Sequence, residues 1–237
     1  IKSFAIPQPT AYTKIFDFSI ASGADGRVFI LWLGNIYIGT SYHCKVYLYY
    51  LDNLDTNTEV SETLASTDYR KMVSGSIYSA FGFSNGLILF AYYYYPQAIE
   101  THYESWRSIN NWESHAAITA ITPKHQTIEK VTDDIYLLSA NNGRPLRSTD
   151  KCITWTEGTN LGTNIWTFCH YTGEKVLAGV EGSTGAEIWH STDNGTAWSK
   201  VGASTDFPGA TYPLKIIRAT DSLIVVITND GKVYWLE

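Results

Sequence analysis

Short runs of apolar residues, each bounded by turn-forming residues, recur along the whole chain. A period of about 3.6 residues sustained over a dozen positions, which would indicate a helix, is hard to find anywhere. The clearest unit contains successive apolar runs at 165–171, 175–180, 187–191 and 197–201. Turns rich in Gly, Asn and Asp separate these runs, so the unit is predicted to be a four-stranded antiparallel meander.

The same unit recurs before and after this segment. Its other copies have predicted strands at 14–20, 27–33, 46–50 and 60–64; at 76–83, 87–95, 103–107 and 112–117; at 127–132, 135–139, 145–148 and 154–157; and at 214–219, 223–228 and 232–236. The last copy lacks a fourth strand, and the spare N-terminal run 2–6 is expected to complete it by pairing with 233–236.

Repeats of roughly 47 residues lie within the range of about 40 to 50 residues for propeller blades. We therefore predict an all-β fold, a five-bladed β-propeller of four-stranded antiparallel sheets that forms a single domain over residues 1–237 and is closed by its N- and C-terminal strands. A six-bladed propeller is the main alternative, because the first interval is long enough to contain another hairpin. A β-sandwich is the third option.

The composition agrees with strands and excludes several classes of protein. Hydrophobic residues make up 44% of the chain, aromatic residues 14% and charged residues 17%, which argues against disorder and coiled coil. The net charge is −6 and the scattered basic residues form no patch, so nucleic-acid binding is not expected. No apolar stretch reaches the roughly 18 to 20 residues of a membrane span.

The cysteines indicate whether the chain binds a metal or cofactor, and the first residue gives an indication of its cellular location. Cys44, Cys152 and Cys169 are odd in number and lack the spacing of metal ligands, so neither a metal site nor a cofactor is expected. The chain begins with Ile1 rather than Met, which predicts either a removed leader or a fragment. An extracellular, cell-surface or virion-associated location follows as an expectation.

Two segments of the chain match each other closely. They are Ser148-Thr149-Asp150-Lys151-Cys152-Ile153-Thr154-Trp155 and Ser191-Thr192-Asp193-Asn194-Gly195-Thr196-Ala197-Trp198. Both resemble the Asp-box, the S-x-D-x-G-x-x-W signature of sialidase-like (BNR) β-propeller repeats. The Asp side chain is expected to accept backbone N–H bonds, Gly to permit a positive φ, and Trp to pack between sheets. Cys152 replaces the Gly in the first copy, so that turn is expected to be strained or of another type.

The resemblance implies structural roles for the residues of the two boxes, away from the axial opening where ligands usually bind. These structural residues are Ser148, Asp150, Trp155, Ser191, Asp193, Gly195 and Trp198. Sialidase activity would also require an arginine triad, but only Arg218 clearly lies on a predicted inner strand. Ala5 stands where the family's Arg-Ile-Pro motif has its Arg. The sequence therefore favours a protein that is not an enzyme, with no catalytic residues assigned.

Candidate ligand-binding residues come from the abundant aromatic side chains, since flat rings stack on sugar faces. We select Trp32, Trp106, Trp112, Trp166 and Arg218. The preferred hypothesis is a non-catalytic, lectin-like module that recognises glycan or glycoprotein at a cell or particle surface. The alternatives are a structural subunit with protein assembly partners and, third, a glycoside hydrolase. The hydrolase would use paired carboxylates drawn from Asp17, Glu129, Asp133, Asp134 and Asp221.

Overall fold

The computed structural model divides the chain into two compact units, Ile1–Pro123 and Lys124–Glu237. The structure describes residues 14–22, 28–38, 41–51, 59–67, 72–82, 87–96, 102–110, 116–118, 127–139, 142–220 and 223–236. The single domain over residues 1–237 stays a prediction.

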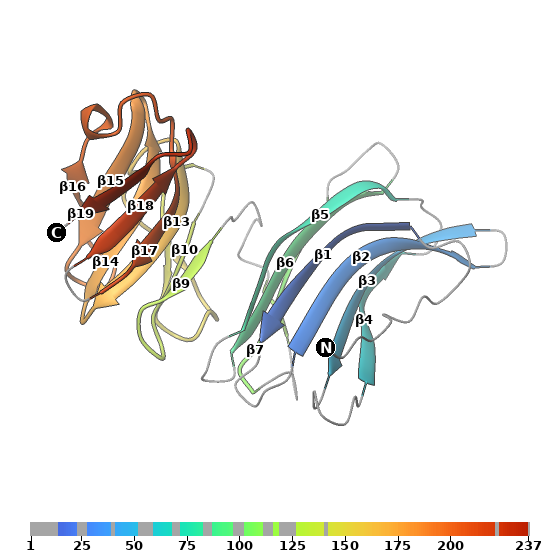
Figure 1. Cartoon of the computed structure of the whole chain (residues 1–237). Coiled ribbons are helices and arrows are strands. Elements are labelled where there is room, and N and C mark those ends of the chain that lie inside the picture. The colour runs from blue at the N-terminus through green and yellow to red at the C-terminus, as the bar shows by residue number, and fades with distance from the viewer. Residues whose placement is uncertain are drawn as a thin grey trace. The chain divides into compact units, whose positions relative to one another are not determined.

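The first unit contains two four-stranded antiparallel sheets (Figure 1). One consists of β1 (Lys14–Ser22), β2 (Val28–Ile38), β3 (Ser41–Leu51) and β4 (Glu59–Thr67), in that order. The other consists of β5 (Met72–Gly82), β6 (Ile88–Pro96), β7 (His102–Ser108) and β8 (Ala116–Ala117). The first strands, β1 and β5, contact each other, so the sheets are neighbours through these strands.

The second unit contains three antiparallel sheets. The first is β9 (Ile128–Lys130), β10 (Tyr136–Leu138), β11 (Leu146–Ser148) and β12 (Thr156–Glu157). The second is β13 (Asn164–Thr172), β14 (Lys175–Gly182), β15 (Gly185–Ser191) and β16 (Ser199–Gly202). A 3₁₀ turn, Ser204–Asp206, leads to the third, which is β17 (Pro213–Arg218), β18 (Ile224–Thr228) and β19 (Val233–Leu236). Here too the first strands are neighbours, because β13 contacts both β9 and β17.

Each of the five predicted repeats is confirmed as one sheet, with strand ends within five residues of the predicted ones. Meandering sheets that adjoin through their first strands are the architecture of a β-propeller, and the fold is all-β as predicted. The last sheet has three strands among the described residues. The closing strand predicted at 2–6 lies outside them. No helix in the described ranges has the length and apolar character of a membrane span.

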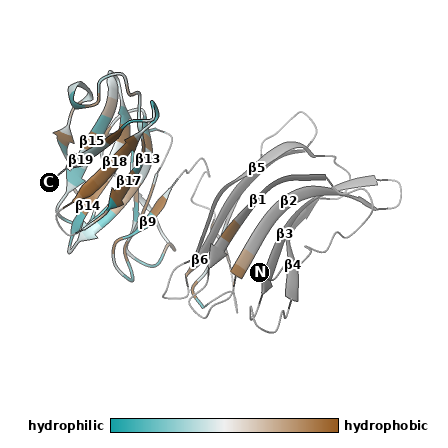
Figure 2. Cartoon of the chain, viewed as in Figure 1, coloured by the Kyte–Doolittle hydropathy of each residue, from teal (hydrophilic) through white to brown (hydrophobic). Residues whose placement is uncertain are grey.

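The central strand β14 shows why these residues form a packed sheet. Successive side chains of a strand point to opposite faces. Val176, Ala178 and Val180 accordingly enter the core against the β9–β12 sheet, whereas Leu177 enters the core against the β17–β19 sheet. Because both faces are covered, β14 is a continuous apolar run, and β18 is likewise apolar in Figure 2.

Candidate functional site

The turn from Ser191 to Trp198 joins β15 to β16 and is held by two side chains. The Ser191 hydroxyl donates to Asp193 Oδ1 (2.8 Å) and accepts the Gly195 N–H (2.8 Å). Asp193 Oδ1 also accepts the N–H groups of Thr196 (3.1 Å) and Ala197 (2.8 Å). The hydrogen bond from Ala197 is the largest cause of the lowered pKa of Asp193. The carboxylate therefore serves the turn itself.

The turn from Ser148 to Trp155 has the same geometry between β11 and β12. Asp150 Oδ1 accepts the Ser148 hydroxyl (2.8 Å) and the N–H groups of Ile153 (3.0 Å) and Thr154 (2.9 Å). Cys152 adopts φ +67°, close to the +81° of Gly195 in the other turn. The turn is therefore of the same type, and Cys152 holds a left-handed conformation that costs a non-Gly residue energy.

A related contact lies at the end of β7, and the Asp-box pattern does not predict it. The Ser108 hydroxyl donates to Asn110 Oδ1 (2.9 Å) and accepts the Asn110 N–H (3.3 Å). Both bonds match those of Ser148 with Asp150 in length (2.8 and 3.4 Å). Ser108, like Ser148 and Ser191, ends the third strand of its sheet. A search that allowed Asn in place of Asp would have found it, because both side chains offer the same oxygen acceptor.

The Ser191–Trp198 turn packs against the preceding sheet. A Cβ atom on Gly195 would lie 2.6 Å from Leu137 Cδ2 of β10, so the turn needs Gly for space as well as for its φ. Arg147 of β11 donates from Nε to the main-chain oxygen of Asn194 (2.8 Å). The Trp198 indole donates to the Gly195 oxygen (3.0 Å) and packs on the core shared by the two sheets. These contacts join the β9–β12 and β13–β16 sheets.

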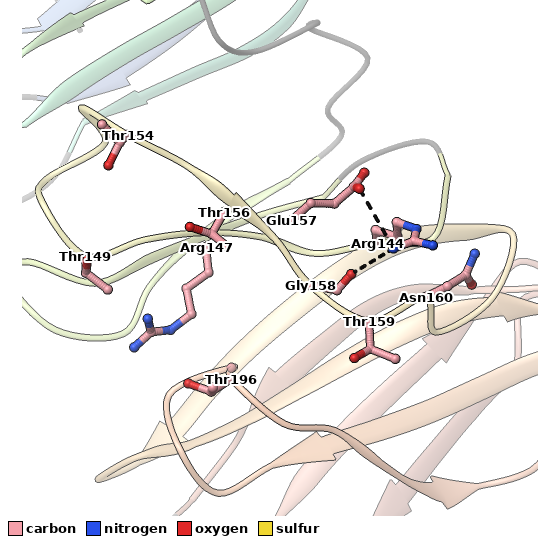
Figure 3. Close-up of a pocket in the computed structure, with 11 residues that line it drawn as sticks. Arg144, Arg147, Thr149, Thr154, Thr156, Glu157, Gly158, Thr159, Asn160 and Thr196 are labelled. Carbon is pink, nitrogen blue, oxygen red and sulfur yellow. Dashed lines mark hydrogen bonds and ion pairs between the residues drawn. The ribbon is translucent and has the colours of Figure 1, made fainter.

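A cleft of about 740 Å³ lies beside this junction, entirely within the second unit. Its walls come from the β10–β11 turn, β11 and β12 with the segments around β12, and the tip of the Ser191–Trp198 turn (Figure 3). The lining residues are Arg144, Arg147, Thr149, Thr154, Thr156, Glu157, Gly158, Thr159, Asn160, Gly195 and Thr196. The side chains of the lining thus carry hydroxyl, amide, carboxylate and guanidinium groups, and none of them carries an aromatic ring.

The hydroxyl groups of the cleft fall into two kinds. Thr154 donates its hydroxyl hydrogen to Asp150 Oδ2 (2.6 Å) and Thr196 donates to the Asp193 oxygen (2.9 Å), so towards a ligand both can only accept. The hydroxyls of Thr149, Thr156 and Thr159 have no hydrogen-bond partner within the part of the chain that the structure describes. These three can donate as well as accept.

Trp166, predicted to bind ligand, lies on the first strand β13 outside the cleft. Its ring stacks on Tyr212 with centroids 3.8 Å apart and an interplanar angle of 9°. Its indole N–H donates to Glu181 Oε2 (3.2 Å), which also accepts the Asn164 amide (2.9 Å). The pair links the β13–β16 sheet to the segment that enters β17, and both rings are half-buried.

The other predicted ligand-binding residues are dispersed. Trp32 lies on β2 with its Cα opposite those of Phe18 and Tyr47, and Trp106 is half-buried on β7. Trp112 lies outside the described residues. Arg218 ends β17. Neither Trp106, Trp166 nor Arg218 lines the cleft, so the structure does not bring the predicted set together.

The carboxylates considered for hydrolysis are also apart. Asp133 and Asp134 lie exposed in the β9–β10 turn, where they contact Lys130 (2.7 Å) and Lys151 (3.7 Å) respectively. The side chain of Asp17 and the whole of Asp221 lie outside the described residues. Glu129 is on the first strand β9, where its Oε1 accepts the His170 N–H (2.9 Å).

The effect of Glu129 on the stability of the fold should depend on pH. Desolvation raises the pKa of its carboxyl, although the His170 N–H and the charges of His170 and Lys215 oppose the shift. A raised folded pKa means that ionisation at neutral pH destabilises the fold, and that this cost disappears below the unfolded pKa of about 4.3. Glu129→Gln keeps the acceptor oxygen and should therefore raise the free energy of unfolding at pH 7. The gain should shrink towards pH 4 in urea titrations, and a gain independent of pH would contradict this assignment.

No protein-family model matches the chain, and no curated protein sequence matches it significantly. Among solved structures, the Hadza microbial sialidase Hz136 superposes with a TM-score of 0.53 and 11% identity over 94% of this chain. A Trypanosoma rangeli sialidase in complex with the inhibitor DANA has a TM-score of 0.47, 10% identity and 94% coverage of this chain. YCF48 from Cyanidioschyzon merolae has a TM-score of 0.46 and 12% identity, with 98% of this chain and 97% of that chain covered.

The chain spans only 52% of the Hz136 sialidase and 45% of the Trypanosoma rangeli sialidase. The likeness to Hz136 establishes a sialidase-like β-propeller fold. Fold alone does not carry activity, which has to be argued from the site.

Proposed function

We propose that this chain is a non-catalytic β-propeller binding module that recognises glycan or glycoprotein through the polar cleft beside the Ser191–Trp198 turn. The observation that carries the proposal is the lining of that cleft by hydroxyl, amide and guanidinium groups. Its volume of about 740 Å³ falls within the range of about 300 to 1,000 Å³ for small-ligand sites.

The chemistry of the lining suits sugar hydroxyls, each of which both donates and accepts. Thr149, Thr156 and Thr159 can complement either role, whereas Thr154 and Thr196 accept only. Glu157 is the one carboxylate of the lining, and its Oε1 already accepts the Asn142 amide (2.7 Å). Glycoside hydrolysis uses two carboxyl groups that flank the bond, so this lining supports binding rather than cleavage.

We also propose that the two matching turns are Asp-boxes with a structural role. Their carboxylates satisfy backbone N–H groups, and the second turn fastens one sheet to the next. Trp166 and Arg218 of the second unit stay proposed ligand contacts, and so, separately, do Trp32, Trp106 and Trp112 of the first unit. A surface lectin of this kind would act outside the cytoplasm, at a cell or particle surface.

A glycan array tests the proposal, with hydrolysis of the bound sugars followed in parallel. Selective binding without turnover is the expected result. Thr156→Trp should abolish it, because Thr156 is an exposed β12 residue whose enlarged side chain would fill the cleft. Thr192→Trp is the matched control, since Thr192 is exposed but does not line the cleft. No binding by the intact chain, or equal binding by both variants, would refute the proposal.

A structural or assembly subunit is the second candidate, and the β17–β19 sheet favours it. Ile217, Val225 and Trp235 form one cross-strand row, in which Ile217 is 42% and Trp235 67% exposed. Val233, two residues from Trp235 and thus on the same face, is 54% exposed. Exposed apolar rows of this kind mark protein contacts. Self-association in light scattering, together with an empty glycan array, would favour this candidate.

A further inference from the structure

We propose that the cleft selects an acidic saccharide, whose carboxylate or sulfate group binds to Arg147 with Arg144 beside it. This inference rests on the proposed glycan-binding function and names the ligand class. The proposed site lies on β11 and β12, the third and fourth strands of their sheet. Its lining contains no residue of the first strand β9.

Arg147 is held in place before any ligand arrives. Its Cα lies opposite Leu137 on β10 and Thr156 on β12, at the middle of the three short strands. Its Nε donates to the Asn194 oxygen (2.8 Å) of the neighbouring turn, which fixes the direction of the guanidinium. Figure 3 shows the side chain extending between Thr149 and Thr196. Within the described residues its Nη groups have no protein partner, so their hydrogens remain for a ligand.

Arg144 is a second cation of the same lining and is only loosely engaged. Its Nη1 is 3.8 Å from Glu157 Oε2 and 3.5 Å from the Gly158 oxygen (Figure 3). The side chains of Arg144 and Glu157 are 43% and 48% exposed, and exposed pairs of this length contribute little. An anion entering the cleft can therefore recruit Arg144 at small cost.

The charge of the lining favours an anion. Arg144 and Arg147 are opposed by one carboxylate, that of Glu157, which leaves the lining with a net positive charge. The carboxylates of Asp150 and Asp193 are not among the lining groups, and each accepts hydrogen bonds within its own turn. In a chain of net charge −6, the two guanidinium groups of the lining offer an anionic ligand a place to pair.

The planar guanidinium also specifies the geometry of the anion. Its paired N–H groups match two oxygens of a carboxylate or sulfate, whereas an ammonium group offers only a point charge. The donor hydroxyls of Thr149, Thr156 and Thr159 would then contact the sugar hydroxyls around the anionic substituent. This combination of anion and polyol identifies an acidic saccharide rather than a neutral one.

Calorimetric titration of the intact chain with three tetrasaccharides tests the inference. The probes are tetragalacturonate for a carboxylate, a κ-carrageenan tetrasaccharide for a sulfate, and the uncharged agarose tetrasaccharide. At low salt we expect one or both acidic probes to bind at least about 10-fold tighter than the neutral one. The stronger acidic probe identifies the anion.

Arg147→Gln should weaken the preferred acidic probe about 10- to 100-fold and the neutral probe little, and Arg147→Lys should not restore the full affinity. Arg144→Gln should cause a smaller loss of affinity for the acidic probe. Because it leaves the contact between Arg147 and Asn194 in place, it still tests the inference if Arg147→Gln alters folding. Lys175→Gln is the control, since it removes an equal charge from an exposed residue outside the cleft. Thermal unfolding checks each variant.

The two proposals fail in different ways. Equal affinity for neutral and acidic probes, or a loss in Lys175→Gln as large as in Arg147→Gln, would overturn the acidic selection and leave glycan binding intact. If no saccharide binds on the array or in calorimetry, the glycan-binding function fails and the acidic selection with it.

Discussion

Gly195→Ala is expected to lower the free energy of unfolding by about 2 to 5 kcal/mol. Two separate costs add. Gly195 has φ +81°, which is unfavourable for a residue with a Cβ atom, and that Cβ would lie 2.6 Å from the Leu137 side chain. Urea denaturation followed by tryptophan fluorescence measures the sum.

Gly231→Ala separates these two costs. Gly231 has nearly the same φ, +82°, but nothing lies within 4 Å of the position of its Cβ. Its substitution should therefore cost only the conformational part, about 1 to 2 kcal/mol. Adding Leu137→Ala to Gly195→Ala should give a smaller loss than the sum of the single variants, because the clash is then absent. Equal losses in the two single Gly variants would contradict the packing of this turn against β10.

Asp193→Ala should destabilise the protein by about 2 to 4 kcal/mol. The substitution leaves the N–H groups of Thr196 and Ala197 without their acceptor and removes the partner of the Ser191 hydroxyl. Thr192→Ala alters an exposed neighbour in the same turn and should change stability by no more than about 0.5 kcal/mol. A loss in Asp193→Ala no larger than that of Thr192→Ala would show that the turn does not depend on this carboxylate.

Asp193→Ala should also change how the free energy of unfolding depends on pH in the acid range. The pKa of Asp193 is lowered in the fold, first by the Ala197 N–H, so ionised Asp193 stabilises the fold above the unfolded pKa of about 3.9. This contribution is lost as the pH falls through the lower, folded pKa. The loss of stability between pH 5 and 2 should therefore be shallower in Asp193→Ala than in the parent chain. Parallel curves for the two proteins would count against the assignment.

Residues at the junction of the two sheets also line the cleft. Gly195 lines the cleft and also packs on Leu137, while Arg147 lines the cleft and bonds to Asn194. The contact that fastens the β13–β16 sheet to the β9–β12 sheet therefore also builds the wall of the cleft. A ligand that binds the cleft only in the folded state would raise the melting temperature.

The sequence alone predicted the strands well, because their signals are local. The apolar run at 175–180 and the turn residues at 172–174 and 192–195 depend only on neighbours in the chain. The Ser-x-Asp turns are local for the same reason, since every bond of Asp193 in the turn joins residues within four positions. Cys152, which stands in place of the Gly of the motif, adds strain to its turn but leaves the turn type unchanged.

The cleft was decided only by the tertiary structure. Arg147 and Gly195 are 48 positions apart, and they meet because the tip of one sheet's turn packs on the face of another sheet. Trp166 was selected as a ligand contact, but stacking on Tyr212 occupies one face of its ring. Periodicity shows which face of a strand is buried, but the contacts between sheets depend on how those sheets pack, which no local pattern encodes. The chain thus specifies its blades by local apolar runs and turns, and its candidate site by packing between blades.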